Sequence, residues 1–423
     1  MTTLISNIRK LVGVRQDNKL LHGRELADLP IIENAYLIIE DGVIVEYGEM
    51  QNLKSDPDNY RDRNSKSEIN GSGQFILPCW CDSHTHLVFA ASREEEFVDK
   101  IKGMSYAAIA AKGGGILNSA KKLNETSEDR LFSLAWQRLS EIGKLGTGAV
   151  EIKSGYGLTV EGELKMLRVI KKLKEKSNLS IRSTFLGAHT YPLEYKENHR
   201  GYCDLIINEM LPVIAGEKLA DYIDVFCENG FFSPSETEAI CRAGMSYGLK
   251  PKLHVNQLNS IGGIQAGIKL KALSLDHLET LTGEDIPSIS RAIDRDGWKG
   301  ICTLLPTAAF FLGLPFQHAR KLIDAGCAIA LASDYNPGSS PSGNMNLVIA
   351  MSCIQMKMLP EEAINAATLN GAYAMELQSE VGSISVGKKA NLLFTKAIPS
   401  LDYLPYSFGT NLIDKVIIDG EII

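Results

Sequence analysis

The sequence predicts a (β/α)8 TIM barrel together with a small β-sandwich domain built from both ends of the chain. Three observations support this fold: eight apolar strand candidates between residues 78 and 380, helical periodicity between most of them, and strand-rich segments at both termini. Eight alternating strand and helix units are typical of a closed parallel barrel. We therefore expect a composite β-sandwich domain from residues 1–77 and 381–423, and a catalytic barrel from residues 78–380.

The terminal segments contain short strands joined by glycine turns. Residues 36–48 have a hairpin pattern in which Glu-Asp-Gly joins two β-branched runs, whereas the polar residues 54–73 indicate a loop. Residues 381–395 and 415–423 predict two further strand pairs. Because both ends of the chain show the same pattern, we expect their strands to share one domain.

The central segment alternates strand candidates with helix patterns. Residues 159–173 place apolar side chains three and four positions apart, which predicts an amphipathic helix. A second helix is predicted over residues 234–244, with Ser233 as its N-cap. The alternative fold, a doubly wound open sheet, is disfavoured because no Gly-x-Gly-x-x-Gly motif follows the first strand. The predicted strands are Leu77–His86, Thr147–Lys153, Ile181–Ala188, Tyr222–Cys227, Lys250–Val255, Ala272–His277, Gly300–Leu305 and Ala328–Ser333.

Composition indicates a globular enzyme and excludes several other classes. The chain has 423 residues, 44% of them hydrophobic, and a formal charge of −7, so neither a nucleic acid nor an anionic membrane is an expected partner. No segment reaches the roughly 18 apolar residues of a membrane span, and the first residues lack the pattern of a signal peptide. Eight cysteines without regular spacing indicate reduced thiols, and we expect a cytoplasmic protein.

Polar side chains recur where the predicted strands end. His84 and His86 close the first strand, and alternating residues on a strand face the same side, so both imidazoles can reach one point. Two imidazoles about 2 Å from a common centre are half of a zinc or iron site. A barrel brings the carboxyl ends of all its strands onto one rim, so the sequence predicts a metal-dependent hydrolase. Later strands end at, or are followed by, Lys153, His189, Glu228, His254, His277 and Asp334.

Longer motifs around these residues narrow the prediction to a family. The His-x-His on strand one, the single histidines on strands five and six and the aspartate on strand eight resemble the amidohydrolase superfamily. More specific motifs are His84–Phe97, Glu151–Leu158, Thr184–Thr190 and Ala332–Gly338. Together, from about Gly42 to the C-terminus, they resemble the imidazolonepropionase family.

This resemblance implies a reaction and a cofactor. The family hydrolyses 4-imidazolone-5-propanoate to N-formimino-L-glutamate, the third step of histidine degradation to glutamate, with one Zn2+ or Fe ion per subunit. The implied metal ligands are His84, His86, His254 and Asp334, which leave room for water or a substrate oxygen. The implied substrate contacts are Arg93, Tyr156, His189, Gln257, Asn336, Gly338 and Ser339. We expect a small anionic substrate and a homodimer.

The chemistry of ring opening assigns the proton transfers. Water must add to a cyclic amide carbonyl while nitrogen is expelled, and a bound metal ion can lower the pKa of water to about 7. Asp334 can accept the proton from that water, and His277 can orient the water or polarise the carbonyl oxygen. Gln257 stands where some family members carry a glutamate, and because an amide cannot take a proton, the base must be Asp334 or His277. The alternative for His277 is a supporting role through Asp276 or Glu279.

Several alternatives remain open at this point. Arg93 can offer a bidentate fork to the propionate of the substrate, or it can form a salt bridge with Glu94–Glu96 at a helix start. Lys153 can in principle be a carboxylated lysine that bridges two metals, although its place on strand two favours one metal. A cyclic-amidine deaminase on the same fold is the alternative function, and the motifs of Arg93 and Tyr156 disfavour it. A relative that has lost its ligands and acts as a binding protein is a further alternative.

Overall fold

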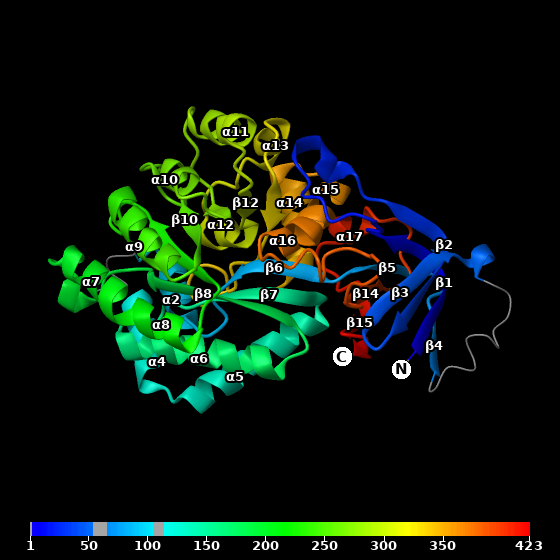
Figure 1. The fold of residues 1–423 in the computed structure, drawn as a ribbon, viewed down its shortest axis with the longest axis horizontal. Helices are drawn as coiled ribbons and strands as arrows, with labels where there is room; N and C mark the ends of the chain where they lie inside the picture. Colours follow the sequence, from blue (N-terminus) through cyan, green and yellow to red (C-terminus); the bar gives the residue numbers. More distant parts are fainter. Residues whose placement is uncertain (1, 54–65, 105–113) are drawn as a thin grey trace.

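The computed structural model describes residues 2–53, 66–104 and 114–423. Within these residues the chain forms two eight-stranded sheets. In Figure 1 one sheet lies among the helices, and the other, made of the blue N-terminal and red C-terminal strands, lies at one end of the molecule with both termini beside it. The predicted fold class, a barrel with a separate β unit built from both ends of the chain, is confirmed.

The barrel strands are parallel and follow one another in sequence order around the sheet. They are β6 (Trp80–Thr85), β7 (Thr147–Lys153), β8 (Ser180–Ala188), β9 (Tyr222–Cys227), β10 (Lys250–Val255), β11 (Ser274–His277), β12 (Ile301–Leu304) and β13 (Ile329–Leu331). Closure occurs just beyond β13, where Thr85 and Tyr335 form a parallel bridge and the His86 amide donates to the Tyr335 carbonyl at 2.9 Å. This closure places the end of β6 against the segment that follows β13.

The first predicted strand, Leu77–His86, contains β6, but its predicted beginning was wrong because the run divides between the two sheets. β5 (Phe75–Pro78) pairs with β14 (Leu392–Thr395) of the terminal sheet, and the Trp80 amide donates to the Gly146 carbonyl of the barrel at 2.8 Å. Both halves of the run are buried, so an apolar pattern alone could not locate the junction at Cys79.

Helices occupy most of the connections between barrel strands. The second predicted helix is α9, which begins after Ser233; the Ser233 hydroxyl accepts from the Glu236 amide, and the Glu236 carboxylate accepts from the Ser233 amide, as in a capping box. The α-helices are α2 (Glu94–Ile101), α4 (Ile116–Glu125), α5 (Glu128–Lys144), α6 (Val160–Lys176), α7 (His199–Leu205), α8 (Leu211–Glu217), α9 (Pro234–Ser246), α10 (Gly263–Lys269), α11 (Asp285–Asp296), α12 (Pro306–Leu312), α13 (Ala319–Asp324), α14 (Met345–Met356), α15 (Pro360–Ala367), α16 (Leu369–Tyr373) and α17 (Tyr403–Tyr406). Shorter turns are the 3-10 helices η1 (Gly23–Ala27), η2 (Met50–Asn52) and η3 (Leu193–Tyr195), and the π-helix η4 (Ile206–Met210).

The terminal sheet joins the two ends of the chain and has a hydrophobic core of its own. Its strands are β1 (Thr2–Val12), β2 (Ile31–Glu40), β3 (Val43–Glu49), β4 (Lys66–Asn70), β5, β14 (Leu392–Thr395), β15 (Ile413–Ile418) and β16 (Glu421–Ile422). The core includes Ile5, Leu37, Ile76, Leu392 and Phe394, which come from both termini. The division into domains at residues 77/78 and 380/381 stays a prediction.

Two expectations for this sheet need correction. Residues 66–70 were predicted as loop but form β4, which pairs in parallel with β1; residues 54–65 of the predicted loop lie outside the described residues. A strand that hydrogen-bonds through its backbone at a sheet edge needs no apolar pattern, which explains the error. Residues 381–395 were predicted as a strand pair but contain β14 as the only strand, together with isolated bridges from Ile384 to Val14 and from Lys389 to Val43.

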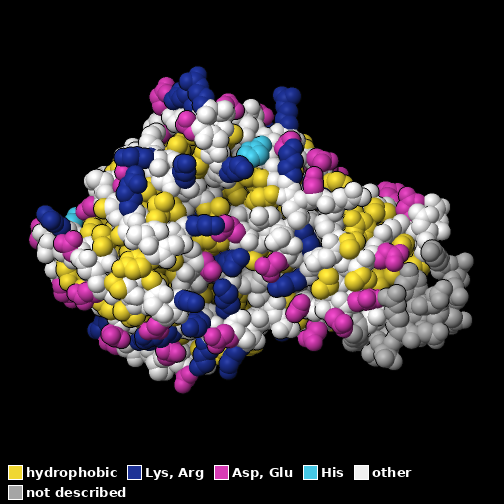
Figure 2. All heavy atoms as spheres, viewed as in Figure 1, with side chains coloured by type: hydrophobic (Ala, Val, Ile, Leu, Met, Phe, Trp, Pro, Cys, Tyr) yellow, Lys and Arg dark blue, Asp and Glu magenta, His cyan; other side chains and the backbone are white. Residues whose placement is uncertain are grey.

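The outer surface carries charges of both signs. On the face shown in Figure 2, lysine and arginine side chains are interspersed with aspartate and glutamate. Such a mixture does not form the basic stripe that nucleic-acid binding requires. Among the described residues, no helix has both the length and the apolar character needed to cross a membrane.

Candidate metal and active site

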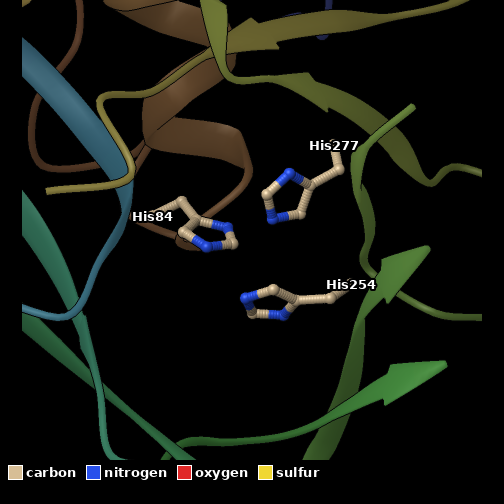
Figure 3. A group of neighbouring side chains, drawn as sticks. All are labelled: His84, His254 and His277. Atoms are coloured by element: carbon tan, nitrogen blue, oxygen red, sulfur yellow. The ribbon is translucent and has the colours of Figure 1, made fainter. Parts of the chain in front are cut away.

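A group of histidines lies at the carboxyl ends of the barrel strands. Figure 3 shows the imidazoles of His84, His254 and His277, from β6, β10 and β11, pointing into one common space. His86 follows β6, and Asp334 follows β13. Within each of two groups, His84–His254–His277 and His84–His86–Asp334, the potential ligand atoms lie within 4.8 Å of one another. These residues form one candidate metal centre.

The four predicted ligands direct side-chain atoms toward the same point. The Nε2 atoms of His86 and His254 lie 3.4 Å apart. The Oδ1 atom of Asp334 lies 3.5 Å from His84 Nε2 and 3.6 Å from His86 Nε2. All four side chains are buried, and burial lowers the pKa of each histidine well below its usual value. The imidazoles are therefore neutral, which is the form that binds a metal ion.

Carboxylates hold the opposite nitrogen of two of these histidines. His84 Nδ1 donates to Asp276 Oδ2 at 2.7 Å, and His254 Nδ1 donates to Asp224 Oδ2 at 2.9 Å. Each bond fixes the tautomer that leaves Nε2 available as a ligand. In the described part of the chain, His84 Nε2 is buried without a hydrogen-bond partner. This donor set and the unpartnered nitrogen fit a transition-metal ion such as zinc or iron.

Lys153 joins the two supporting carboxylates below the cluster. Its Nζ lies 2.8 Å from Asp224 Oδ2, 3.4 Å from Asp276 Oδ2 and 2.6 Å from Glu151 Oε1, and Lys252 contacts the same glutamate. Burial opposes the charged form of Lys153, but the three carboxylates outweigh burial and raise its pKa. An ammonium group held by three carboxylates is not available for carboxylation, so the arrangement gives no support to a lysine-bridged pair of metals.

His277 is held by a different carboxylate. Its Nδ1 donates to Glu279 Oε1 at 3.2 Å, and Gln317 donates from Nε2 to the same oxygen at 2.9 Å. Burial lowers the pKa of His277, but the carboxylates of Glu279 and Asp334 outweigh it and raise the pKa to about 9. His277 is therefore protonated at neutral pH, and its second nitrogen can also donate a hydrogen bond.

The loop after β13 shapes the surroundings of Asp334. Burial raises the pKa of Asp334 to about 6, and the Ser339 hydroxyl donates to its Oδ2 at 3.0 Å. Asn336 Oδ1 accepts the amides of Gly338 at 2.7 Å and Ser339 at 2.8 Å. Asn336 therefore stabilises the conformation of this loop.

The inner of two adjoining cavities opens onto the metal cluster, and the predicted substrate contacts line one or both cavities. The inner cavity contains His86, His254, His277 and Asp334 in its wall. The outer cavity, of about 870 Å³, has an apolar mouth that includes Phe97, Phe310 and Phe311. Tyr156, His189, Gln257, Asn336 and Ser339 line both cavities, while Arg93 and Gly338 line the outer one.

Arg93 lines the outer cavity, and one nitrogen of its guanidinium has no hydrogen-bond partner among the described residues. Its Nε donates to the Ser119 hydroxyl at 2.8 Å, and its guanidinium lies 5.8 Å from the centre of the Tyr156 ring. Its Nη2 is buried without a partner among the described residues, and no ion pair between Arg93 and Glu94–Glu96 occurs among them. A Cβ added at Gly338 would lie 2.5 Å from Arg93 Nη1, so the glycine leaves room for the guanidinium.

The Tyr156 loop is held by a buried carboxylate from α6. Glu163 accepts the amides of Gly155 at 3.0 Å, Gly157 at 2.7 Å and Leu158 at 3.0 Å. Burial raises the pKa of the Tyr156 hydroxyl, so it remains a hydrogen-bond donor. The rigid turn thus presents a neutral phenol to the cavity.

His189 meets the same turn from β8. Its Nδ1 donates to the Gly155 carbonyl at 3.0 Å, and burial lowers the pKa of His189 to about 4. A neutral imidazole that donates from Nδ1 has Nε2 as an acceptor. His189 can therefore accept a hydrogen bond from an N–H group in the cavity.

Several residues that hold the site together were not predicted from the sequence. Ser119 and Glu163 were not identified, and Asp224 was not connected with His254. Acidic residues in the first turn of a helix are usually solvent-exposed, so the burial of Glu163 could not be predicted from the pattern. Asp224 lies inside the predicted strand β9, where alternate residues share one face. A charged residue at such a position was the available indication that its side chain points into the barrel.

Comparison with known proteins identifies the family. The chain is 58% identical to the imidazolonepropionase of Flavobacterium johnsoniae, and the match covers 100% of both chains. The chain belongs to the imidazolonepropionase family. The imidazolonepropionase of Christiangramia forsetii is 53% identical, again over 100% of both chains. The amidohydrolase family matches residues 232–423.

A solved structure agrees with the fold. E. coli guanine deaminase superposes with a TM-score of 0.73, covering 100% of this chain and 99% of the deaminase at 14% sequence identity. At this identity the likeness concerns the barrel and its attached sheet alone. The imidazolonepropionase relatives, not this structure, therefore separate the family from the deaminases.

Proposed function

We propose that this chain is a metal-dependent hydrolase that opens the ring of 4-imidazolone-5-propanoate to give N-formimino-L-glutamate. This is the third step in the degradation of histidine to glutamate. One observation carries the proposal: two adjoining cavities contain a His/Asp metal cluster in the wall of the inner one and Arg93, with its unpartnered Nη2, in the wall of the outer one. A cyclic amide that carries a carboxylate has the two groups that such a site can recognise.

We assign one metal ion per subunit, zinc or iron, to His84, His86, His254 and Asp334. When bound, the ion supplies Lewis acidity that activates water and polarises the amide carbonyl. The carboxylates that hold two of the histidines, and the ion pairs of Lys153, support a single-metal site.

Asp334 and His277 provide the proton acceptor and the hydrogen-bond donor for the reaction. Water adds to the ring carbonyl carbon, the bond from that carbon to nitrogen breaks, the expelled nitrogen takes up the proton that the water released, and the carbon ends as a carboxylate. Asp334, with a pKa of about 6, is ionised at neutral pH and accepts the proton of the attacking water. His277, with a pKa of about 9, is protonated and donates a hydrogen bond toward the carbonyl oxygen rather than acting as the base.

The remaining residues bind and orient the substrate. Arg93 pairs with the propionate, with Ser119 holding its Nε and Gly338 leaving room beside it. Tyr156 donates from its hydroxyl, and His189 accepts a ring N–H. Asn336 and Ser339 keep the loop beside Asp334 in shape, and the Gln257 amide hydrogen-bonds the substrate or the water without taking a proton.

The proposal is tested by comparing three substrates at equal enzyme and metal concentration. We expect turnover of 4-imidazolone-5-propanoate, a much lower kcat/KM for an imidazolone without the propionate, and no deamination of guanine. Guanine turnover would instead support the cyclic-amidine deaminase. Elemental analysis of protein purified without added metal distinguishes zinc from iron and tests the count of one. The homodimer and the cytoplasmic location remain predictions.

A further inference from the structure

Glu228, which follows β9, is a buried carboxylate that the reaction described above does not use. It is 1% exposed and lines neither cavity. Its Oε2 accepts the backbone amides of Leu258 at 2.9 Å and Asn259 at 3.1 Å. Its Oε1 accepts the Asn259 side-chain amide at 3.0 Å and the Asn229 amide at 2.7 Å. Two of its four donors are therefore backbone groups of the loop after β10.

The opposite side of the same loop is held from β11. The Thr280 amide donates to the Asn256 carbonyl at 2.8 Å, and Asn256 Nδ2 donates to the Thr280 carbonyl at 2.9 Å. Asn256 has a φ of 55°, in the left-handed region, so its backbone conformation depends on such contacts. Asp285 Oδ2 accepts from Asn256 Nδ2 at 3.2 Å and from the Ser260 hydroxyl at 3.1 Å.

These contacts fix both peptide groups that flank Gln257. The peptide before Gln257 carries the Asn256 carbonyl, which Thr280 holds, and the peptide after it carries the Leu258 amide, which Glu228 holds. With both peptide planes fixed, the direction in which the Gln257 side chain leaves the backbone is fixed as well. Gln257 lines both cavities, so this direction decides where its amide meets the substrate.

We propose that Glu228 is a positioning residue that sets the place of Gln257 in the active site. The inference rests on the proposed role of Gln257 in substrate or water binding. All four groups that contact the Glu228 carboxylate are N–H donors, so only a group with two acceptor oxygens satisfies them. A glutamine at this position has one acceptor oxygen and one NH2 group. In either orientation its NH2 group would therefore face N–H donors and lose their hydrogen bonds.

The test combines Glu228→Gln with Gln257→Ala in a double-mutant cycle. We expect Glu228→Gln to lower kcat/KM about 10- to 100-fold, because small misplacements of a contacting group have effects of that size. The change should divide between KM and kcat as it does in Gln257→Ala. In the Gln257→Ala background, Glu228→Gln should have little further effect, since the group that it positions is gone.

Hydrogen exchange gives a readout that does not depend on turnover. The Leu258 and Asn259 amides should exchange faster in Glu228→Gln, while bound metal stays unchanged. Glu236→Gln is the matched control, because Glu236 also accepts a backbone amide after β9 but contacts Ser233 and Tyr191 instead of this loop. The control should leave both the exchange of the loop and KM as in the wild type.

Several outcomes would overturn the inference. Equal losses from Glu228→Gln with and without the Gln257 side chain would show that Glu228 acts by another route, and wild-type kinetics or unchanged exchange would show no positioning at all. Should Glu228→Gln not fold, Asn259→Ala removes one donor and should give a smaller change in the same direction. If the wild type does not hydrolyse imidazolone propanoate, the proposed function fails, while hydrogen exchange still decides whether Glu228 holds the loop.

Discussion

The backbone amide of Asp334 donates a hydrogen bond to the carbonyl oxygen of His84 at 3.0 Å, although the two residues lie at opposite ends of the barrel sequence. This bond belongs to the contact that closes the barrel between β6 and the segment after β13. The same contact places Asp334 Oδ1 3.5 Å from His84 Nε2. The contact that closes the barrel therefore also brings Asp334 next to the two histidines at the end of β6.

The first prediction follows for the metal ligands. His254→Ala should remain folded, since the hydrophobic core does not depend on the ion, but should retain little metal and almost no turnover. His318→Ala is the control, because His318 is exposed and lies before α13, away from the cluster. Metal content measured after dialysis, together with kcat, decides the assignment. Near wild-type hydrolysis by His254→Ala in metal-depleted buffer would contradict it.

The barrel was predictable because its signals are local and repeated. The strands β7, β9 and β10 have the predicted boundaries, since each buried run is bounded by polar residues or turns. The junction at Cys79 and the strand β4 were not predictable from hydrophobicity. In the first case burial is continuous across two sheets, and in the second the pairing is made by the backbone of polar residues.

The candidate site was only partly predictable for a related reason. Residues that project from strand ends could be identified from position, as His84, His254 and His277 show. Glu228 holds a loop from the neighbouring unit of the barrel, and Glu163 holds the turn just before its own helix. Both relationships exist only after the chain has folded. The orientation of the Arg93 guanidinium, which leaves Nη2 without a partner among the described residues, likewise depends on a hydrogen bond to Ser119 of another helix.

Arg93 and Gly338 give the second prediction. Arg93→Met should mainly raise KM and lower kcat/KM about 30- to 1,000-fold, because loss of a charge-assisted pair amounts to roughly 2–4 kcal/mol. Gly338→Ala should raise KM with little change in Tm, because its Cβ would displace only the flexible end of Arg93. Gly283→Ala, which meets open space, serves as the control. An unchanged KM in Arg93→Met would remove Arg93 from the substrate contacts.

The third prediction concerns the base. Metal-loaded Asp334→Asn should lose far more kcat than metal-loaded Gln257→Ala, because an amide cannot accept the proton of water. The loss of kcat in His277→Ala should lie between those of the other two variants, and this variant should retain its metal. Gln257→Glu should keep the metal and a measurable rate, with an altered pH profile. A larger loss of kcat in Gln257→Ala than in Asp334→Asn would assign the chemical step to residue 257.

The last prediction uses Lys388, which lies between the barrel and β14. Its buried ammonium donates to the Val381 carbonyl at 3.0 Å and the Ser383 hydroxyl at 2.8 Å, and it forms no ion pair within the described residues. Burial lowers the pKa of Lys388 to about 8 from its usual 10.5. Between these values the unfolded chain keeps a proton that the folded chain has released, so stability rises with pH in this window. The free-energy cost of burying the charged ammonium is complete below about pH 8 and disappears as the pH approaches 10.5.

Relative to Lys388→Met, the wild type should therefore gain about 2 kcal/mol in free energy of unfolding between pH 7.5 and 9.5. Urea unfolding of both proteins at the two pH values measures this difference, in which the other titrating groups cancel. A difference that stays constant with pH would show that the ammonium keeps an ordinary pKa in the folded protein.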